Sequence, residues 1–218
     1  MKLEIDELSM DKQTVLSNVQ KQILIGSLLG DGHLETQNHG KTFRFTVVQS
    51  SKKALYFQYL YDQFQDLITT PVYTRTYQTR QGFSSTLRFT TRTNTLFTPY
   101  GFMFYCGGVK QVPACIEEIL TPLGLSIWYM DDGSVKSSQS KGVYFNTQSF
   151  SVSDIDRLCL VLKTKFQIDS WKRQDSGNYR IYVSGKSYER LGSLITPYFT
   201  DDMWYKWPCP RKSKKRNE

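Results

Sequence analysis

Two segments of this sequence carry acids directly after an apolar run. ILIGSLLGDG, residues 23–32, places Asp31 at its end, and GLSIWYMDDG, residues 124–133, places Asp131 and Asp132 there. A carboxylate beside a buried segment is costly unless a cation or hydrogen bonds compensate it. If the runs form a packed pair of helices, their C-terminal ends bring Asp31 and Asp132 together. Both acids then repel each other at the negative end of a helix dipole.

A hard divalent cation between the two acids would relieve both problems. Mg²⁺ suits such a site, because carboxylate oxygens, phosphate oxygens and waters are its preferred ligands. The same ion can polarise a phosphodiester and help to deprotonate a water. For one copy alone, "DDG" is better explained as an ordinary helix stop followed by turn residues. The second "DG" at the equivalent place favours the metal site, with Asp31 and Asp132 as its acids.

An ordered series of landmarks indicates that the chain contains two copies of one unit. Asp31 and Asp132 are 101 residues apart, and the later landmarks recur in the same order at similar offsets. They are Gln49 and Gln148, LRF at 87–89 and YRI at 179–181, TPY at 98–100 and 196–198, and the lysines before a proline, Lys110 and Lys206.

Each copy predicts the element order αββαββα. The first helices are expected near 19–30 and 124–131, and the second near 52–66 and 153–166, the latter with Ser153 as its N-cap. The strands alternate apolar and polar residues, which predicts antiparallel sheets open on one face. We therefore predict an α+β fold made by pseudo-symmetric duplication. Its parts are an N-terminal extension (1–18), a first half (19–113), a second half (114–208) and a basic tail (209–218).

The outward strand positions favour nucleic acid. Residues 72–95 contain four arginines and no acid, and the whole chain has a net charge of +8 and a pI of about 9.2. Such surfaces suit phosphates and base edges, although an ordinary solvated sheet face is also polar. The candidate DNA-binding residues are Arg44, Thr46, Arg75, Tyr77, Arg80, Arg88, Thr90, Arg92, Lys136, Lys141, Asn146, Lys172, Arg173, Arg180 and Tyr182.

Four further residues are candidates for catalysis. Lys110 or Lys206 near a scissile phosphate would neutralise developing charge or orient a water. A surface lysine at a helix end is the structural alternative. Gln49 and Gln148 would position water near metal, or else contact the backbone.

The composition argues against several other classes of protein. Four scattered cysteines and two histidines form no zinc motif, so the cysteines are expected to be reduced. The start, MKLEIDELSM, has no apolar stretch of secretory length, and the longest apolar run is too short to span a bilayer. We expect an intracellular protein without a membrane segment.

LIGSLLGDG and LSIWYMDDG resemble the two signature helices of the LAGLIDADG homing endonucleases. LTPLGLSIWYMDDG, NTQSF and YKWP are especially similar to the monomeric two-motif branch, and the resemblance covers about residues 20–208. It implies saddle-shaped sheets on the DNA major groove, with the motif helices at the domain interface.

The resemblance also implies staggered double-strand cleavage with 3′ overhangs and divalent metal. That metal would be Mg²⁺ or Mn²⁺, with Ca²⁺ able to bind without supporting cleavage. Asp31 and Asp132 correspond to the catalytic acids and Lys110 and Lys206 to the active-site lysines. Gly30 and Asp131, which directly precede these acids, are two further predicted metal positions. Asp131 corresponds to a non-catalytic neighbour of the catalytic acid.

The sequence therefore predicts a monomeric, site-specific DNA endonuclease that reads a long asymmetric site. An intron RNA maturase on the same fold, or a DNA-binding regulator without catalysis, remains an alternative. Kinship alone suggests an organellar home, in a mitochondrion or chloroplast.

Overall fold

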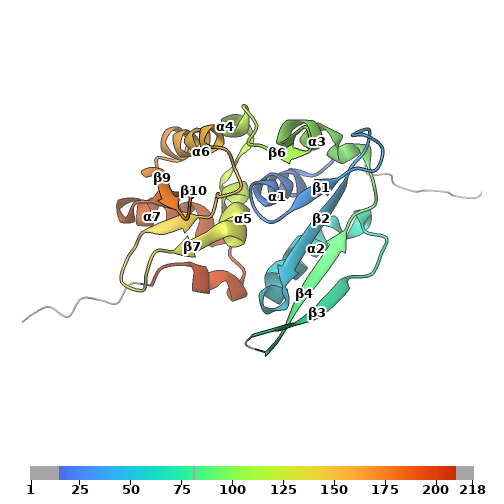
Figure 1. Cartoon of the computed structure of the whole chain (residues 1–218), viewed down its shortest axis with the longest axis horizontal. Helices are drawn as coiled ribbons and strands as arrows, with labels where there is room; N and C mark the ends of the chain where they lie inside the picture. The colour runs from blue at the N-terminus through green and yellow to red at the C-terminus, as the bar shows by residue number, and fades with distance from the viewer. Residues whose placement is uncertain (1–14, 81, 210–218) are drawn as a thin grey trace, which may run out of the picture.

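Two four-stranded antiparallel sheets of identical topology form the protein. The computed structural model describes residues 15–80 and 82–209, so most of the predicted N-terminal extension and basic tail lies outside the described residues. The sheet orders are β1-β2-β4-β3 and β7-β8-β10-β9, and the sheets lie on either side of helices α1 and α5 (Figure 1). The predicted α+β class and its duplication are confirmed.

The first half begins with α1 and ends with a small two-stranded hairpin. Its elements are α1 (Asn18–Leu29), β1 (His33–Glu35), β2 (Arg44–Ser50), η1 (Ser51–Lys53), α2 (Ala54–Phe64), η2 (Gln65–Leu67), β3 (Tyr73–Thr79), β4 (Gly82–Thr90), η3 (Thr95–Phe97), α3 (Thr98–Phe104), β5 (Tyr105–Cys106) and β6 (Val109–Lys110).

The second half repeats this order after a short helix, α4. Its elements are α4 (Ile116–Ile119), α5 (Pro122–Asp132), β7 (Gly133–Val135), β8 (Val143–Phe145), α6 (Val152–Thr164), β9 (Ser170–Asp175), β10 (Asn178–Val183), η4 (Gly185–Ser187), α7 (Tyr188–Ile195), η5 (Thr196–Tyr198) and η6 (Asp201–Lys206). The boundary proposed at residues 113 and 114 falls just before α4.

Alternation along the strands places the core under each sheet. Phe45, Val47 and Phe89 are buried on the helix side of the first sheet. Phe145 and Ile181 are fully buried at matching places in the second. Successive strand residues point to opposite faces, so the residues between these apolar positions form the other face of each sheet.

The two halves meet where α1 packs against α5, and glycine makes this close approach possible. A Cβ added at Gly26 would lie 2.4 Å from the carbonyl oxygen of Gly124 and 2.7 Å from the Cβ of Ile127. Such distances exclude any side chain at Gly26 without separating the helices. Polar bonds also cross between the halves, since the Gln22 side chain donates to the Ile119 carbonyl oxygen at 2.9 Å and accepts from the Thr121 hydroxyl at 2.7 Å.

One predicted helix start is wrong by two residues. Helix α6 begins at Val152, and Ser151, rather than Ser153, is its N-cap. The Ser151 side chain accepts a hydrogen bond from the backbone N–H of Asp154 at 3.1 Å. Ser151 has the extended backbone of an N-cap, whereas Ser153 already lies inside the first turn.

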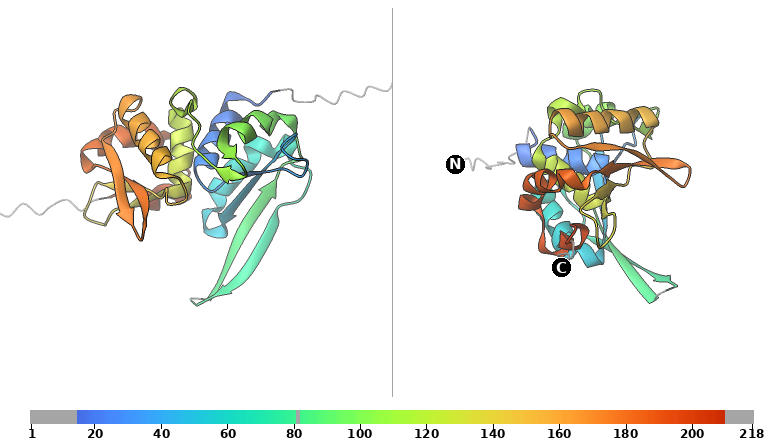
Figure 2. Two further views of the ribbon diagram at one scale, coloured as in Figure 1. Left: turned by 45° about the horizontal axis from the view of Figure 1, so that its top comes forward. Right: turned by 90° about the vertical axis from the view of Figure 1, so that its left-hand side faces the viewer.

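The two sheets differ in reach. Strands β3 and β4 form a long ribbon that extends beyond the body of the molecule, whereas β9 and β10 stay closer to it (Figure 2). No helix in the described ranges is long and apolar enough to cross a membrane.

Candidate active site and nucleic-acid interface

Asp31 and Asp132 lie where the paired motif helices end. The backbone N–H of Asp31 donates to Oδ2 of Asp131 at 3.3 Å, so the two helix ends are in direct contact. Asp31 is exposed and Asp132 is partly exposed. Partial burial, and then the charge of Asp31, raise the pKa of Asp132 to about 7, although Lys206 and Lys110 oppose that rise.

Lys110 and Lys206 hold the chain beside each aspartate. Lys110 Nζ donates to the carbonyl oxygens of Gly30 and Gly32, at 3.0 and 2.8 Å. Lys206 Nζ donates to the carbonyl oxygens of Met130 and Asp131, both at 2.6 Å. Burial lowers the pKa of both lysines, although the neighbouring aspartates counteract this effect. The two lysines occupy corresponding places, as the repeat predicted.

The carboxylate pair fits a divalent cation. Within the described part of the chain, no side chain donates a hydrogen bond to the Asp132 carboxylate and no ion pair holds it. No group of three or more His, Cys, Asp and Glu side chains there could hold a metal ion by itself. Phosphate and water oxygens would have to supply the remaining ligands of a cation held by Asp31 and Asp132. The carbonyl oxygens of Gly30 and Asp131, at the other two predicted metal positions, already accept from the lysines.

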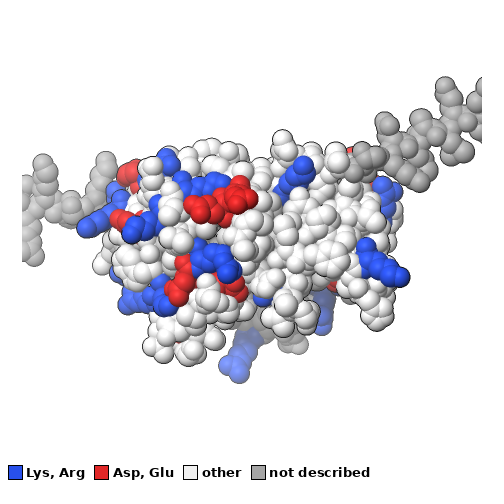
Figure 3. Space-filling view, turned by 90° about the horizontal axis from the view of Figure 1, so that it is seen from above, with Lys and Arg blue, Asp and Glu red and all other residues white. Residues whose placement is uncertain are grey.

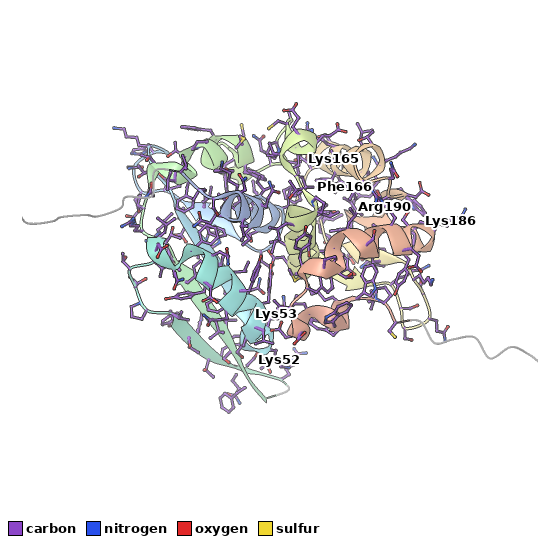
Figure 4. All side chains as sticks on the ribbon, turned by 180° about the vertical axis from the view of Figure 1, so that it is seen from behind. Lys52, Lys53, Lys165, Phe166, Lys186 and Arg190 are labelled. Carbon is purple, nitrogen blue, oxygen red and sulfur yellow. The ribbon has the colours of Figure 1, made fainter. Side chains whose placement is uncertain are left out.

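Gln49 lies between two acids. Its Nε2 donates to Oδ1 of Asp131 at 2.8 Å and to Oδ2 of Asp31 at 3.3 Å. Its Oε1 accepts from Nζ of Lys53 at 3.0 Å. Lys53 is near the N-terminal end of α2, where this helix meets η6 of the second half (Figure 4). A third lysine thus stands close to the acids.

The structure does not place Gln148 at the position that matches Gln49. Thr46 pairs with Thr90 across β2 and β4, and Tyr144 pairs with Tyr182 across β8 and β10. Counting three residues on from Thr46 and from Tyr144 makes Thr147 the counterpart of Gln49. Gln148 instead donates to Oδ2 of Asp175 at 2.9 Å. The loop after β8 shifts the glutamine by one residue, which changes the direction of its side chain.

An acid organises the outer face of the first sheet. Glu35 accepts from Nε of Arg44 at 2.8 Å and from Nη2 of Arg88 at 3.2 Å, and His33 Nε2 lies 2.9 Å from its Oε1. Burial alone would raise the pKa of Glu35. Hydrogen bonds from His33 and Arg44, together with the charge of Arg44, outweigh burial, and the pKa is lowered.

The other predicted residues of the first half lie beside Glu35 or farther along the sheet. Thr46 and Thr90 lie beside it, with their hydroxyls 3.1 Å apart, and Thr46 is fully buried. Arg75 and Tyr77 are exposed on β3, opposite Thr86 and Ser84, and Arg80 is exposed in the turn beyond. Arg92 follows the end of β4 and is partly exposed.

Aromatic rings organise the outer face of the second sheet. The Arg180 guanidinium lies 3.8 Å from the centre of the Tyr144 ring, and Arg173 Nη1 donates to the Tyr144 hydroxyl at 3.2 Å. Tyr182 packs between Tyr144 and the half-exposed Trp171, at 5.3 and 4.9 Å between ring centres. Lys136 Nζ is 5.3 Å from the centre of the Tyr182 ring.

Three predicted DNA-binding residues lie elsewhere or face another group. Lys172 pairs with the buried Ile181, which puts it on the helix side of the sheet, and Nζ donates to Asp156 of α6 at 2.8 Å. Lys141 donates to Glu189 of α7 at 3.1 Å. Asn146 Nδ2 donates to the carbonyl oxygen of Asp132 at 2.8 Å. Lys172 and Arg173 are neighbours on β9, so their side chains point to opposite faces, and only Arg173, which pairs with Arg180, lies on the outer face.

The helix side of the molecule does not share the excess of basic residues that the sheet faces carry. The face seen from above, which carries α3, α4 and α6, shows acids and bases intermixed over the second half (Figure 3). Mixed charge of this kind is typical of an ordinary solvated surface. The sheet side therefore remains the better candidate for a polyanion.

Sequence reasoning missed Lys53, Tyr56 and Glu35, and it named Asp131 only as a metal position, without its hydrogen bonds to Gln49 and Tyr56. Tyr56 donates its hydroxyl to Oδ1 of Asp131 at 2.9 Å, and burial with the nearby acid raises its pKa well above the usual value. The pair of lysines in QSSKK, directly after Gln49, was a signal that could have identified Lys53.

Comparison with known proteins agrees with the geometry. The LAGLIDADG DNA endonuclease family model matches residues 21–191, so the chain belongs to this family. DNA endonuclease I-ChuI of Chlamydomonas applanata is 31% identical over 207 residues, which cover 88% of this chain and 95% of that protein.

Two further proteins are similar over most of this chain. The cytochrome b mRNA maturase bI2 of Saccharomyces cerevisiae is 31% identical over 84% of the chain, which spans less than half, 46%, of that maturase. The homing endonuclease I-WcaI bound to its DNA recognition sequence has the same fold. Its TM-score is 0.82 at 24% identity, covering 94% of this chain and 95% of that one.

Proposed function

We propose that this protein is a monomeric, site-specific DNA endonuclease that cuts both strands of a long asymmetric site with Mg²⁺. One observation carries the proposal. Asp31 and Asp132 reach the surface together at the ends of paired helices, each with a lysine held beside it, between two sheets lined with arginine. This combination suits a phosphodiester held in a major groove better than any small substrate.

The chain's own residues divide the work. Asp31 and Asp132 would hold the cation, which when bound supplies Lewis-acid polarisation of the phosphate and a more acidic water. Lys110 and Lys206 are fixed by backbone carbonyls next to these acids, so their charge is available to developing negative charge nearby. Gln49 is held beside Asp31, where its amide can orient a water. The arginines of the two sheets fix the duplex in register.

The activities of similar proteins support this assignment. A similar protein of nearly the same length is a DNA endonuclease, and a structure with the same fold is bound to its recognition sequence. The long ribbon of β3 and β4 would extend the first half's contact along the groove, so the two halves would cover unequal lengths of DNA.

Cleavage of a selected target tests the proposal. A randomised duplex library, incubated with the protein and Mg²⁺, should yield cut members that share one long asymmetric sequence. Mg²⁺ and Mn²⁺ should support cutting of that target in a plasmid, and Ca²⁺ should support binding only. Asp31→Asn and Asp132→Asn should each reduce the cleavage rate by on the order of a hundredfold or more, because a metal ligand is lost.

Asp66→Asn is the matched control, because this exposed acid lies in η2, away from the motif helices. It should cut at the parental rate. Cleavage by Asp31→Asn or Asp132→Asn as fast as by the parent would refute the proposed mechanism. Sequence-specific binding by the parent without any cutting would instead identify a DNA-binding regulator.

A second candidate function is an intron RNA maturase, because a protein of that name is 31% identical over most of this chain. The exposed aspartates favour the nuclease, and both activities can coexist on one fold. Splicing of the host intron in the presence and absence of the protein would separate them. Intron-encoded relatives also make an organellar location part of this proposal.

A further inference from the structure

The Asp131 carboxylate is buried between the two halves and is held by donors from the first half alone. Only 6% of Asp131 is exposed. Oδ1 accepts from the Tyr56 hydroxyl at 2.9 Å and from Gln49 Nε2 at 2.8 Å, and Oδ2 accepts from the Asp31 backbone N–H at 3.3 Å. A buried carboxylate is costly, and three hydrogen bonds of this kind are what can stabilise it.

The first half has no equivalent acid, and it has no room for one. Asp131 precedes Asp132 as Gly30 precedes Asp31. A Cβ at Gly30 would lie 2.5 Å from the Asp131 Cβ and 2.8 Å from its Oδ2. The Asp131 side chain thus fills the space that a residue at position 30 would need, and the pseudo-symmetric seam can hold only one of the two acids.

The support around the two aspartates is unequal as a result. Asp131 bonds the backbone of Asp31 directly, and it also holds Gln49, whose amide contacts the Asp31 carboxylate. At the corresponding place in the second half, Thr147 is fully buried and its hydroxyl donates to the carbonyl oxygen of Tyr179 at 3.4 Å. Among the residues that the structure describes, Asn146 bonds Asp132 through its backbone N–H and its Nδ2, both of which donate to the Asp132 carbonyl oxygen and not to its carboxylate.

The N-terminal turn of α2 is bonded to two acids of the second half, Asp202 and Asp131. Asp202 of η6 accepts from the backbone N–H groups of Leu55 and Tyr56, at 2.8 and 3.2 Å, and so caps α2 from the second half. Tyr56 itself is fully buried and reaches back to Asp131. Asp131 and Asp202, both in the second half, therefore hold Tyr56 in position, and Asp131 also holds Gln49.

We propose that Asp131 is a positioning residue that holds Asp31 and Gln49 in place, so that cleavage of the two DNA strands depends on it unequally. The inference rests on the proposed nuclease function. Asp131 contacts neither DNA nor metal in this role. It acts through Asp31, and its loss should slow one strand much more than the other.

Single-turnover cleavage of a target with each strand labelled differently tests the inference. The cleavage rates of both DNA strands are first measured with Asp31→Asn and with Asp132→Asn. The strand that Asp31→Asn slows more is the strand that depends on Asp31. Asp131→Asn keeps the size of the side chain but cannot accept from all three donors. It should slow cleavage of that strand by on the order of ten- to a hundredfold relative to the other, because small displacements of a catalytic group have effects of this size.

Tyr56→Phe is a second, gentler variant, since it removes one donor and keeps the ring. It should slow the same strand by a smaller factor. Asp156→Asn, which alters an acid on α6 far from the seam, is the matched control and should leave the ratio of the two strand rates unchanged. Thermal melting and DNA binding in Ca²⁺ confirm that each variant is folded.

Three results would overturn the inference. They are equal slowing of both strands by Asp131→Asn, parental rates on both strands, and equal dependence of both strands on Asp31. A parent protein that binds its selected target but cuts neither strand would overturn the proposed function, and the inference with it. The strand ratio distinguishes these cases, because a general loss of stability lowers both rates together.

Discussion

The two sheets share one topology but order their arginines by different chemistry. In the first half Glu35 bonds Arg44 and Arg88 through charge-assisted hydrogen bonds. In the second half Arg180 stacks on Tyr144, and Arg173 bonds the hydroxyl of that ring. Position 35 corresponds to Lys136 in the second half, so an acid on one face is replaced by a base on the other.

This difference teaches how a duplicated fold can come to recognise an asymmetric partner. A carboxylate beside DNA opposes non-specific attraction and favours arginines aimed at particular base edges. Rings beneath an arginine restrain it, and Asp175 lies 3.8 Å from Nε of Arg180. That ion pair is longer than the two that Glu35 makes, so it offsets less of the arginine charge. We infer that the first face contributes more to selectivity and the second more to general affinity.

The largest expected effect concerns the seam, where the halves are also unequal. Gly26→Ala should lower the free energy of unfolding by about 2–3 kcal/mol, because the new methyl would meet the Gly124 backbone at 2.4 Å. Gly124→Ala should change it by less than about 1 kcal/mol. Its nearest neighbour is the Gln22 amide oxygen at 2.8 Å, which accepts from Thr121 and can shift more readily than backbone, and alanine favours the helix. Urea unfolding measures both, and equal losses would mean that the two sides of the seam are equivalent.

The next effect tests the role of the acid on the first face. Glu35→Gln should reduce the preference for the selected target over unrelated DNA by about tenfold, roughly 1.4 kcal/mol, since the two arginines lose their shared anchor. Affinity for unrelated DNA should rise as a negative charge leaves the interface.

Competition binding at fixed salt measures that preference. Glu189→Gln, which removes the partner of Lys141 away from the sheet face, should leave it unchanged. A preference that survives Glu35→Gln intact would show that Glu35 only balances charge.

The smallest effect belongs to the second face. Tyr144→Leu removes the ring below Arg180 and should weaken binding of the selected target about two- to fivefold, in line with about 0.5–1 kcal/mol for a partly exposed cation–π contact. Tyr144→Phe keeps the ring and loses only the bond from Arg173, so it should have less effect. Dissociation constants measured side by side decide this, and equal values for the two variants would argue against stacking.

Much of the fold could be predicted because its signals are local. The repeated apolar runs, the alternation in segments such as FRFTV, and the acids after each run follow from helix and strand periods. Face assignments were less secure, because a one-residue shift reverses every side chain of a strand. Gln148 was misplaced by one residue, Lys172 was grouped with its neighbour Arg173 although the two face opposite sides, and Ser151 caps α6 in place of the predicted Ser153.

The sequence by itself determined that the chain is a duplication, that each copy ends a motif helix in an aspartate, and that the strand faces carry arginine. Those properties are set by residue type and order. Only the tertiary structure decided that Asp131 turns into the seam towards Gln49 and Tyr56, that Glu35 gathers two arginines, and that Thr147 replaces a second glutamine. These contacts join residues distant in the chain, and no local period encodes such packing.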